Sequence, residues 1–250
     1  MWPHSRPRRP VTPVTQSVTG PSPYGLDRYR RAGSGRCRTY PRGVARFTVG
    51  FDLDMTLIDP RQGMVEVFAI LADETGIPLD GAGFVTRLGP PLAHEFARYG
   101  LADEVVAALV ERYRELYPDV VVPVSRPMPG ALEAIKAVAE RDGDVIVVTA
   151  KFQPTAVRHL DALGIEVAAV VGDVWSHGKA AALTAHGAEV FVGDHLGDIT
   201  GARAADALAV AVATGPISAE DLAAAGADVV LEDLTRFPSW LDTYLRATVH

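Results

Sequence analysis

The sequence predicts an α/β protein in which a parallel β-sheet carries helices on both faces, with a small block of helices inserted near its start. Two patterns carry this prediction. From residue 130 onward, short runs rich in valine and alanine alternate with helical segments, which is typical of parallel strands joined by crossover helices. Before that point, residues 64–128 show helical spacing broken by glycine and proline. We therefore expect a Rossmann-like core and a separate α-helical cap.

The first strand of the sheet is predicted at Phe47–Leu53, where a nearly continuous apolar run fits a strand buried on both faces. Asp52, Asp54 and Thr56 end this stretch. Alternation places the two aspartates on the same face of an ideal strand, where they repel unless a cation or a shared proton holds them. A single aspartate here would be a helix cap in a polar turn. The Asp-x-Asp-x-Thr spacing instead indicates a divalent metal, of which Mg²⁺ suits oxygen ligands, or acid–base chemistry.

The inserted block is expected to be helical because its apolar residues recur at helical spacing. Glycine and proline separate its segments, with Gly76 after the first helix and Gly89–Pro91 before the next. The prolines that follow Tyr117 are expected to end the last helix. The predicted helices are Met64–Thr75, Pro91–Tyr99 and Ala102–Tyr117, and Asp80–Gly83 is expected to be a turn.

The remainder of the chain alternates regularly between helix and strand. Pro129 precedes the first of these helices, and Gly164 and Gly187 follow two later ones, which are the usual start and stop signals. The predicted strands are Val145–Val148, Val167–Val171, Glu189–Val192, Ala207–Val212 and Val229–Leu231. The predicted helices are Ala131–Arg141, Gln153–Leu163, Gly178–His186, Leu196–Ala205, Ser218–Ala225 and Leu234–Arg246.

The first 46 residues differ from the rest in composition. They hold ten arginines and one acid, Asp27, so the remainder has 14 basic and 30 acidic residues and a net charge of −16. Poor in large apolar side chains, this segment cannot offset the entropy of ordering. We expect residues 1–46 to be a disordered, dispensable extension, in preference to a targeting sequence or an RNA-binding arm. The core is then expected at 47–62 and 129–250, and the cap at 63–128.

Composition also excludes several classes of protein. An acidic folded body argues against nucleic-acid binding. No apolar run approaches the roughly 20 residues of a membrane span, and the N-terminus lacks the apolar region of a secretory signal. Cys37 is the only cysteine, so neither an intrachain disulfide nor a multi-cysteine zinc site can form. We therefore expect a cytoplasmic protein without a membrane partner, and we leave a homodimer open.

Further polar residues stand at or just beyond the ends of the later predicted strands. Thr149 ends one strand, Lys179 follows another, and Asp194 and Asp198 follow a third. Because parallel strands end at one edge of the sheet, these side chains and the two aspartates of the first strand are expected to share a crevice. Carboxylates collect Mg²⁺, and hydroxyl and ammonium groups bind phosphate oxygens. The sequence therefore indicates a site for a phosphorylated ligand and a metal.

Lysine is scarce in this chain, which makes its positions informative. The lysines are Lys136, Lys151 and Lys179, and all other side-chain positive charge at neutral pH is arginine. Lys179 would ordinarily be a solvated helix residue, but here it follows a strand end. Lys151 is close to Thr149 and is a second candidate for lining the site. Thr149 by itself would be a strand-end hydrogen bond or a helix cap, and its context favours a phosphate contact.

This pattern resembles the haloacid dehalogenase-like (HAD) phosphohydrolase superfamily from about residue 44 to the C-terminus. Its first motif is matched by Asp52–Thr56, its second by Thr149, its third by Lys179 and its fourth by Asp194–Asp198. The helical insertion directly after the first motif is similar to the cap of the phosphoglycolate phosphatase branch. Met55 stands where the family commonly has glycine.

The resemblance implies a role for each matched residue. Asp52 would be the nucleophile that forms an aspartyl-phosphate, and Asp54 the general acid and base, with a raised pKa. Thr149 and Lys179 would bind the phosphate. The Mg²⁺ would be held by the Asp52 carboxylate, the Asp54 backbone carbonyl and Asp194, with Asp198 close by or acting through water.

The implied reaction is Mg²⁺-dependent hydrolysis of a small-metabolite phosphomonoester that resembles phosphoglycolate. Arg61, beside the first motif, and Arg87, before the Gly89–Pro91 break, are candidates for substrate contacts. Alternatives within the same fold are a sugar-phosphate or nucleotide phosphatase and a phosphosugar mutase. From another class, the chain would be a non-catalytic HAD-like binding module. Asp54 argues against dehalogenation, because dehalogenases of this superfamily lack that second acid.

Overall fold

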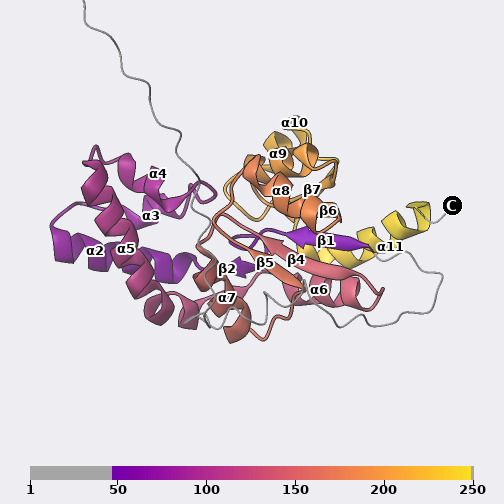
Figure 1. Cartoon of the computed structure of the whole chain (residues 1–250), viewed down its shortest axis with the longest axis horizontal. Helices are drawn as coiled ribbons and strands as arrows, with labels where there is room; N and C mark the ends of the chain where they lie inside the picture. Colours follow the sequence, from indigo (N-terminus) through magenta and orange to yellow (C-terminus); the bar gives the residue numbers. More distant parts are fainter. Residues whose placement is uncertain (1–46, 249–250) are drawn as a thin grey trace, which may run out of the picture.

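The computed structural model describes residues 47–248, so the prediction of disorder over residues 1–46 lies outside the described residues. Within them, a parallel sheet has the strand order β5-β4-β1-β6-β7-β8 (Figure 1). The chain winds from β1 through β4 to β5, then crosses to β6 on the other side of β1. Ligands bind where the winding reverses in such sheets. The strands are β1 Thr48–Phe51, β4 Asp144–Val148, β5 Ala169–Val171, β6 Ala188–Gly193, β7 Leu208–Val212 and β8 Val229–Leu231.

Helices cover both faces of the sheet, and strand alternation divides the apolar side chains between two cores. Val145 and Val147 of β4 pack into one core, and Ile146 and Val148 into the other. The first core is closed by α6 Ala131–Ala139, α7 Gln153–Ala162 and α11 Phe237–Thr248 (Figure 1). The second is closed by α8 Gly178–Ala185, α9 Leu196–Ala204 and α10 Ala219–Ala224 (Figure 1). The predicted α/β fold with a parallel sheet is confirmed.

A group of helices lies to one side of the sheet, and the chain reaches it directly after β1 (Figure 1). Its centre is aromatic: the Phe68 ring stacks on Phe84 at 4.4 Å and on Phe96 at 5.4 Å between ring centroids. These helices are α2 Arg61–Thr75, α3 Gly81–Phe84, α4 Leu92–Ala97 and α5 Asp103–Val120, followed by the 3-10 turn η2 Val122–Val124. The apolar spacing of the sequence therefore marks helices that pack on one another as well as on the core.

Short strands join this helical group to the sheet. β2 Ile58–Asp59 pairs with the antiparallel β3 Arg126–Pro127, so the segments that enter and leave the group lie side by side. Two-residue strands have no periodicity to read, and the sequence did not predict them.

The helix ends differ from the predicted ones in places. Asp80–Gly83 was expected to be a turn, but the Asp80 side chain accepts a hydrogen bond from the Gly83 amide at 2.7 Å and starts the one-turn helix α3. α5 continues through Pro118 to Val120, and the Val121 amide then donates to the Tyr117 carbonyl at 2.9 Å. Among the described residues, no helix is long and apolar enough to cross a membrane.

Candidate active site

The turn after β1 is built to present carboxylates. The Asp52 amide donates to the Val192 carbonyl of β6 at 2.8 Å, and the amides of Leu57 and Ile58 both donate to the Leu53 carbonyl. Met55 adopts a left-handed conformation with φ of 62°. Glycine adopts this conformation without a steric penalty, whereas Met55 does not. Burial of the Met55 side chain in the core stabilises the conformation here. The turn thus fixes Asp52 and Asp54 at the carboxyl end of the central strand.

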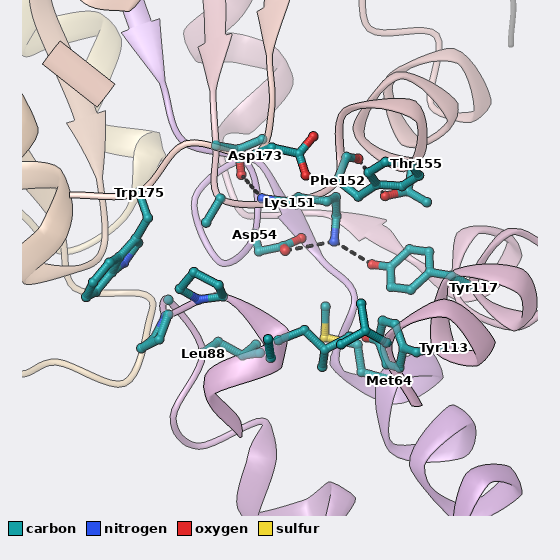
Figure 2. A pocket seen from close by; sticks show the side chains of 18 of the residues that line it. Asp54, Met64, Leu88, Tyr113, Tyr117, Lys151, Phe152, Thr155, Asp173 and Trp175 are labelled. Atoms are coloured by element: carbon teal, nitrogen blue, oxygen red, sulfur yellow. Dashed lines mark hydrogen bonds and ion pairs between the residues drawn. The ribbon is translucent and has the colours of Figure 1, made fainter. Parts of the chain in front are cut away.

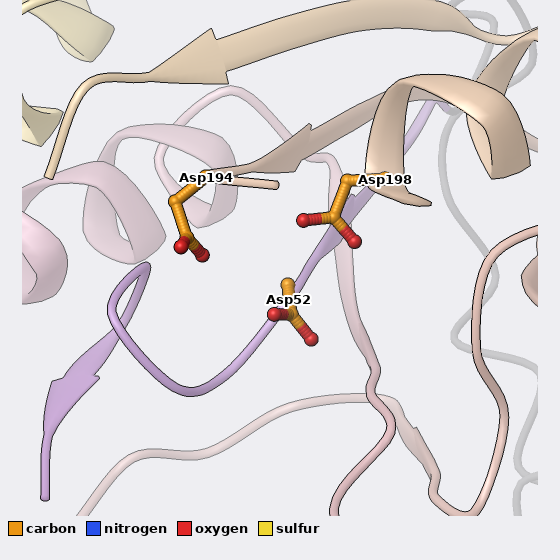
Figure 3. Close-up of side chains that lie close together, drawn as sticks. All are labelled: Asp52, Asp194 and Asp198. Atoms are coloured by element: carbon orange, nitrogen blue, oxygen red, sulfur yellow. The ribbon is translucent and has the colours of Figure 1, made fainter. Parts of the chain in front are cut away.

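Carboxylates from two distant parts of the chain meet at this edge. Oxygens of Asp52, Asp194 and Asp198 lie within 4.8 Å of one another, and all three residues are buried (Figure 3). The Thr56 hydroxyl donates to the Asp194 carboxylate at 2.9 Å. Asp198 accepts from the His195 amide at 3.1 Å as part of a capping box that starts α9. His195 therefore serves the start of α9, where its ring Nδ1 also accepts a hydrogen bond from the Gly197 amide at 3.1 Å.

Lys179, in the first turn of α8, is buried against these acids. Its ammonium donates to Asp52 at 2.9 Å and to Asp198 at 2.6 Å. Burial lowers the pKa of this lysine, but the Asp198 and Asp52 charges outweigh burial, so its pKa is raised. Lys179 is thus held charged in the middle of the acidic cluster.

The cluster fits a divalent cation. Burial, with the charges of Asp198 and Asp52, raises the pKa of Asp194 well above its usual value, and burial raises the pKa of Asp198 to about 6. Three carboxylates face one ammonium, so negative charge is left over in a buried place. Oxygen donors and excess negative charge are what Mg²⁺ requires.

Asp54 has a different partner. One carboxylate oxygen, Oδ2, accepts from the Lys151 ammonium at 2.8 Å, and the other, Oδ1, is buried with no hydrogen-bond partner among the described residues (Figure 2). Burial raises the pKa of Asp54, although Lys151 partly opposes the effect. Asp54 therefore combines a raised pKa with one oxygen that is free to act.

Lys151 links Asp54 to the helical group. Its ammonium also donates to the Tyr117 hydroxyl of α5 at 2.6 Å (Figure 2). The Tyr117 hydroxyl lies 3.0 Å from Nε2 of His159, and burial lowers the pKa of His159 to about 2, so this imidazole is neutral. With Lys151 donating to its oxygen, Tyr117 is left to donate its own hydrogen to His159. The sequence indicated Lys151 only as a second candidate for lining the site. Neither Tyr117 nor His159 stands in a sequence pattern that predicts this series of hydrogen bonds.

A cavity of about 220 Å³ lies between this edge of the sheet and the helical group. Asp52, Asp54, Thr149 and Asp194 line it on the side of the sheet, which we call its floor. Thr149 is buried at the end of β4, and its hydroxyl accepts from the Lys151 amide at 3.3 Å, which leaves the hydroxyl hydrogen free to donate. The chemistry-bearing groups therefore face one enclosed space.

Arg61 and Arg87, the predicted substrate contacts, lie apart from that space. The Arg61 guanidinium is paired with Asp59 at 2.6 Å and Arg87 with Glu95 at 2.6 Å, and neither is among the residues that line the cavity. Their role toward a substrate stays a prediction. Phe152 and Trp175 also line the cavity.

Known proteins with similar sequences and folds agree with this geometry. A family model described as haloacid dehalogenase-like hydrolase matches residues 49–203. A phosphoglycolate phosphatase of Caulobacter vibrioides is 31% identical over 218 residues, which cover 79% of this chain and 92% of that protein. A probable phosphatase, IndB, of Dickeya dadantii is 27% identical, covering 73% of this chain and 87% of its own length. A crystal structure of a predicted phosphatase from Clostridium acetobutylicum has the same fold, with a TM-score of 0.69, 21% identity and coverage of 80% and 100%.

The parallel sheet, the acidic edge and these matches together define a hydrolase. The chain belongs to the haloacid dehalogenase-like hydrolase family, as the sequence resemblance implied. Its phosphatase relatives indicate a phosphoric monoester hydrolase within that family.

Proposed function

We propose that this protein is a Mg²⁺-dependent phosphatase that hydrolyses a small phosphomonoester through an aspartyl-phosphate on Asp52. The observation that carries the proposal is the different environment of two neighbouring aspartates. Asp52 is held by a charged lysine inside an acidic cluster, while Asp54 has a raised pKa and a free oxygen. Asp52 is therefore suited to attack phosphorus, and Asp54 is suited to donate and accept a proton.

In the first step, a carboxylate oxygen of Asp52 bonds to phosphorus while the bond from phosphorus to the leaving oxygen breaks. Asp54 donates its proton to that oxygen, so an alcohol departs. In the second step, Asp54 takes a proton from a water molecule that attacks phosphorus. The bond between phosphorus and Asp52 breaks, and inorganic phosphate leaves.

Other residues hold the phosphoryl group. The Thr149 hydroxyl, which lines the cavity, would donate to a phosphate oxygen, and the Lys179 charge would offset negative charge beside Asp52. Asp52, Asp194 and Asp198 would hold Mg²⁺ together with the Asp54 backbone carbonyl, and the bound metal would offset charge on the transferring group. We propose residues 63–128 as the cap that covers the site, within a cytoplasmic enzyme.

Phosphoglycolate is the first substrate to test, because a relative 31% identical to this chain is a phosphoglycolate phosphatase. Sugar phosphates and nucleotides are the alternatives, and a phosphosugar mutase would instead transfer the phosphoryl group between sugar positions. Release of inorganic phosphate from a panel of such esters, with Mg²⁺ and with a chelator, tests the proposal.

We expect turnover only with Mg²⁺, and a loss of at least about 10³-fold in Asp52→Asn. Asp59→Asn, a change of the same chemistry outside the cavity, is the matched control and should retain activity. Full turnover by Asp52→Asn would rule out the nucleophile. Ligand binding without any turnover would favour a non-catalytic module.

A further inference from the structure

We propose that the alcohol released by this enzyme is neutral and carries an apolar body about the size of a ring, rather than being a short carboxylate such as glycolate. This inference rests on the proposed phosphatase function and concerns only the half of the cavity away from Asp52. It follows from the composition of that half, its charges and its size.

The wall that faces the leaving group is apolar. α2 contributes Met64, α3 contributes Phe84, and α5 contributes Val110. Phe152 and Trp175 approach from the core, and Figure 2 shows them together with Met64. These side chains favour apolar surface over water, and none of them offers a carboxylate a positive charge.

The positive charges near this wall are already engaged. Among the described residues that line the cavity, the cationic side chains are Lys151 and Arg114. Arg114 donates to Glu111 at 2.9 Å, lies 3.8 Å from Asp173, and stacks over the Phe152 ring at 4.2 Å. Turning Lys151 toward a substrate carboxylate would put a second negative charge beside Asp54. A substrate carboxylate would therefore find no unpaired cation along the described lining and would have to take Arg114 from its acidic partners.

The volume also fits a ring better than a two-carbon acid. An apolar cavity of about 150 Å³ is enough to hold benzene, and this cavity of about 220 Å³ has a floor that takes the phosphoryl group. A glycolate group would leave most of the apolar wall facing water.

Two unpaired donors that line the cavity within residues 47–248, the Tyr113 hydroxyl and the Trp175 indole N–H, are left for a neutral oxygen on the ring or its chain. The Tyr113 hydroxyl of α5 is buried, lines the cavity, and has no hydrogen-bond partner among the described residues. Burial, together with the Asp54 charge, raises the Tyr113 pKa well above its usual value, so the hydroxyl stays protonated and able to donate. A hydroxyl, ether or carbonyl oxygen on the leaving group would satisfy it.

The test compares benzyl phosphate, ethyl phosphate and 2-phosphoglycolate on the full chain with Mg²⁺. All are esters of alkyl alcohols, so large differences between them report binding rather than aryl leaving-group acidity. We expect kcat/KM for benzyl phosphate to exceed those of the other two by at least about tenfold. An equal or higher kcat/KM for 2-phosphoglycolate would overturn the inference. Turnover of p-nitrophenyl phosphate separates this result from a failure of the proposed function, in which no ester would release phosphate.

A pair of variants on α5 tests the wall itself. Val110→Arg places a cation in the cavity and should lower kcat/KM for benzyl phosphate about tenfold while raising that for 2-phosphoglycolate. Val105→Arg makes the same change at an exposed position of the helix and should leave the ratio unchanged. Leu92→Arg, on the cavity wall from α4, serves if circular dichroism shows that Val110→Arg is unfolded. An unchanged ratio in a folded wall variant would overturn the inference.

Discussion

The two aspartates of the first motif are two residues apart, yet they belong to different halves of the site. Asp52 is held by Lys179 and lies beside Asp198, and all of these groups stand on the sheet or its helices. Asp54 is held by Lys151, which in turn donates to Tyr117 on α5 of the helical group. The environment of Asp52, the proposed nucleophile, is therefore complete within the core, whereas that of Asp54, the proposed proton donor, depends on how the helical group sits.

The largest effect is expected from breaking the core half with Lys179→Met. This change leaves buried carboxylates without their ammonium, and breaking a buried pair in this way costs about 3–5 kcal/mol. We expect phosphate release to fall at least about 10³-fold and the free energy of unfolding in urea to drop by that amount. Lys136→Met removes a lysine whose surface partner Glu140 is 3.5 Å away, and should change neither quantity measurably. Equal phosphate release and equal free energies of unfolding in the two variants would contradict the proposed role of Lys179 in the acidic cluster.

Breaking the other half with Lys151→Met should reduce kcat by about 10- to 100-fold while the fold is retained. Without Lys151, the largest effect that opposes burial at Asp54 is lost, so the pKa of Asp54 rises further and the basic limb of the kcat/KM profile moves to higher pH. Tyr117→Phe removes only the hydroxyl and should give a smaller shift in the same direction, with Tyr244→Phe on α11 as the control. A lysine that only packs would leave the pH profile in place.

The buried imidazole behind Tyr117 predicts a pH-dependent stability. The pKa of His159 is lowered to about 2, so below pH 6.5 the unfolded chain binds a proton that the folded chain does not. We expect this residue to lower the free energy of unfolding by up to about 1.4 kcal/mol for each pH unit below 6.5. Urea unfolding of wild type and His159→Gln at pH 7, 6 and 5 isolates this slope, because other titrating groups act equally in both. If the free energy of unfolding falls equally with pH in both proteins, His159 does not contribute to the pH dependence of stability.

The smallest effects are expected outside both halves. Arg61→Ala breaks an exposed ion pair and should change stability by less than about 0.5 kcal/mol and kcat/KM by less than about twofold. Arg87→Ala leaves Glu95 with a more distant partner, so it should cost about 1 kcal/mol without changing KM. A raised KM for any ester in either variant would instead support these arginines as substrate contacts.

These contrasts also show what sequence could predict. The apolar strands could be predicted from their composition. The meeting of their acidic ends could be predicted because parallel strands bring their carboxyl ends to one edge of the sheet. The series of hydrogen bonds from Lys151 through Tyr117 to His159 could not be predicted, because single hydrogen bonds join α5 to residues far away in the sequence. The two candidate arginines have acidic partners nearby in sequence, but only side-chain geometry shows the pairs: Arg61 bonds Asp59 and Arg87 bonds Glu95.

The pairing of β2 with β3 has a consequence for how this enzyme can vary. Ile58 lies opposite Pro127 and Asp59 opposite Arg126, so everything between them leaves the core and returns to it at one spot. Inserted segments with neighbouring ends are exchanged readily because the host fold does not have to stretch. The part of the cavity wall that comes from α2–α5 could therefore be exchanged as a unit, provided that the replacement keeps a partner for Lys151 in the place of Tyr117.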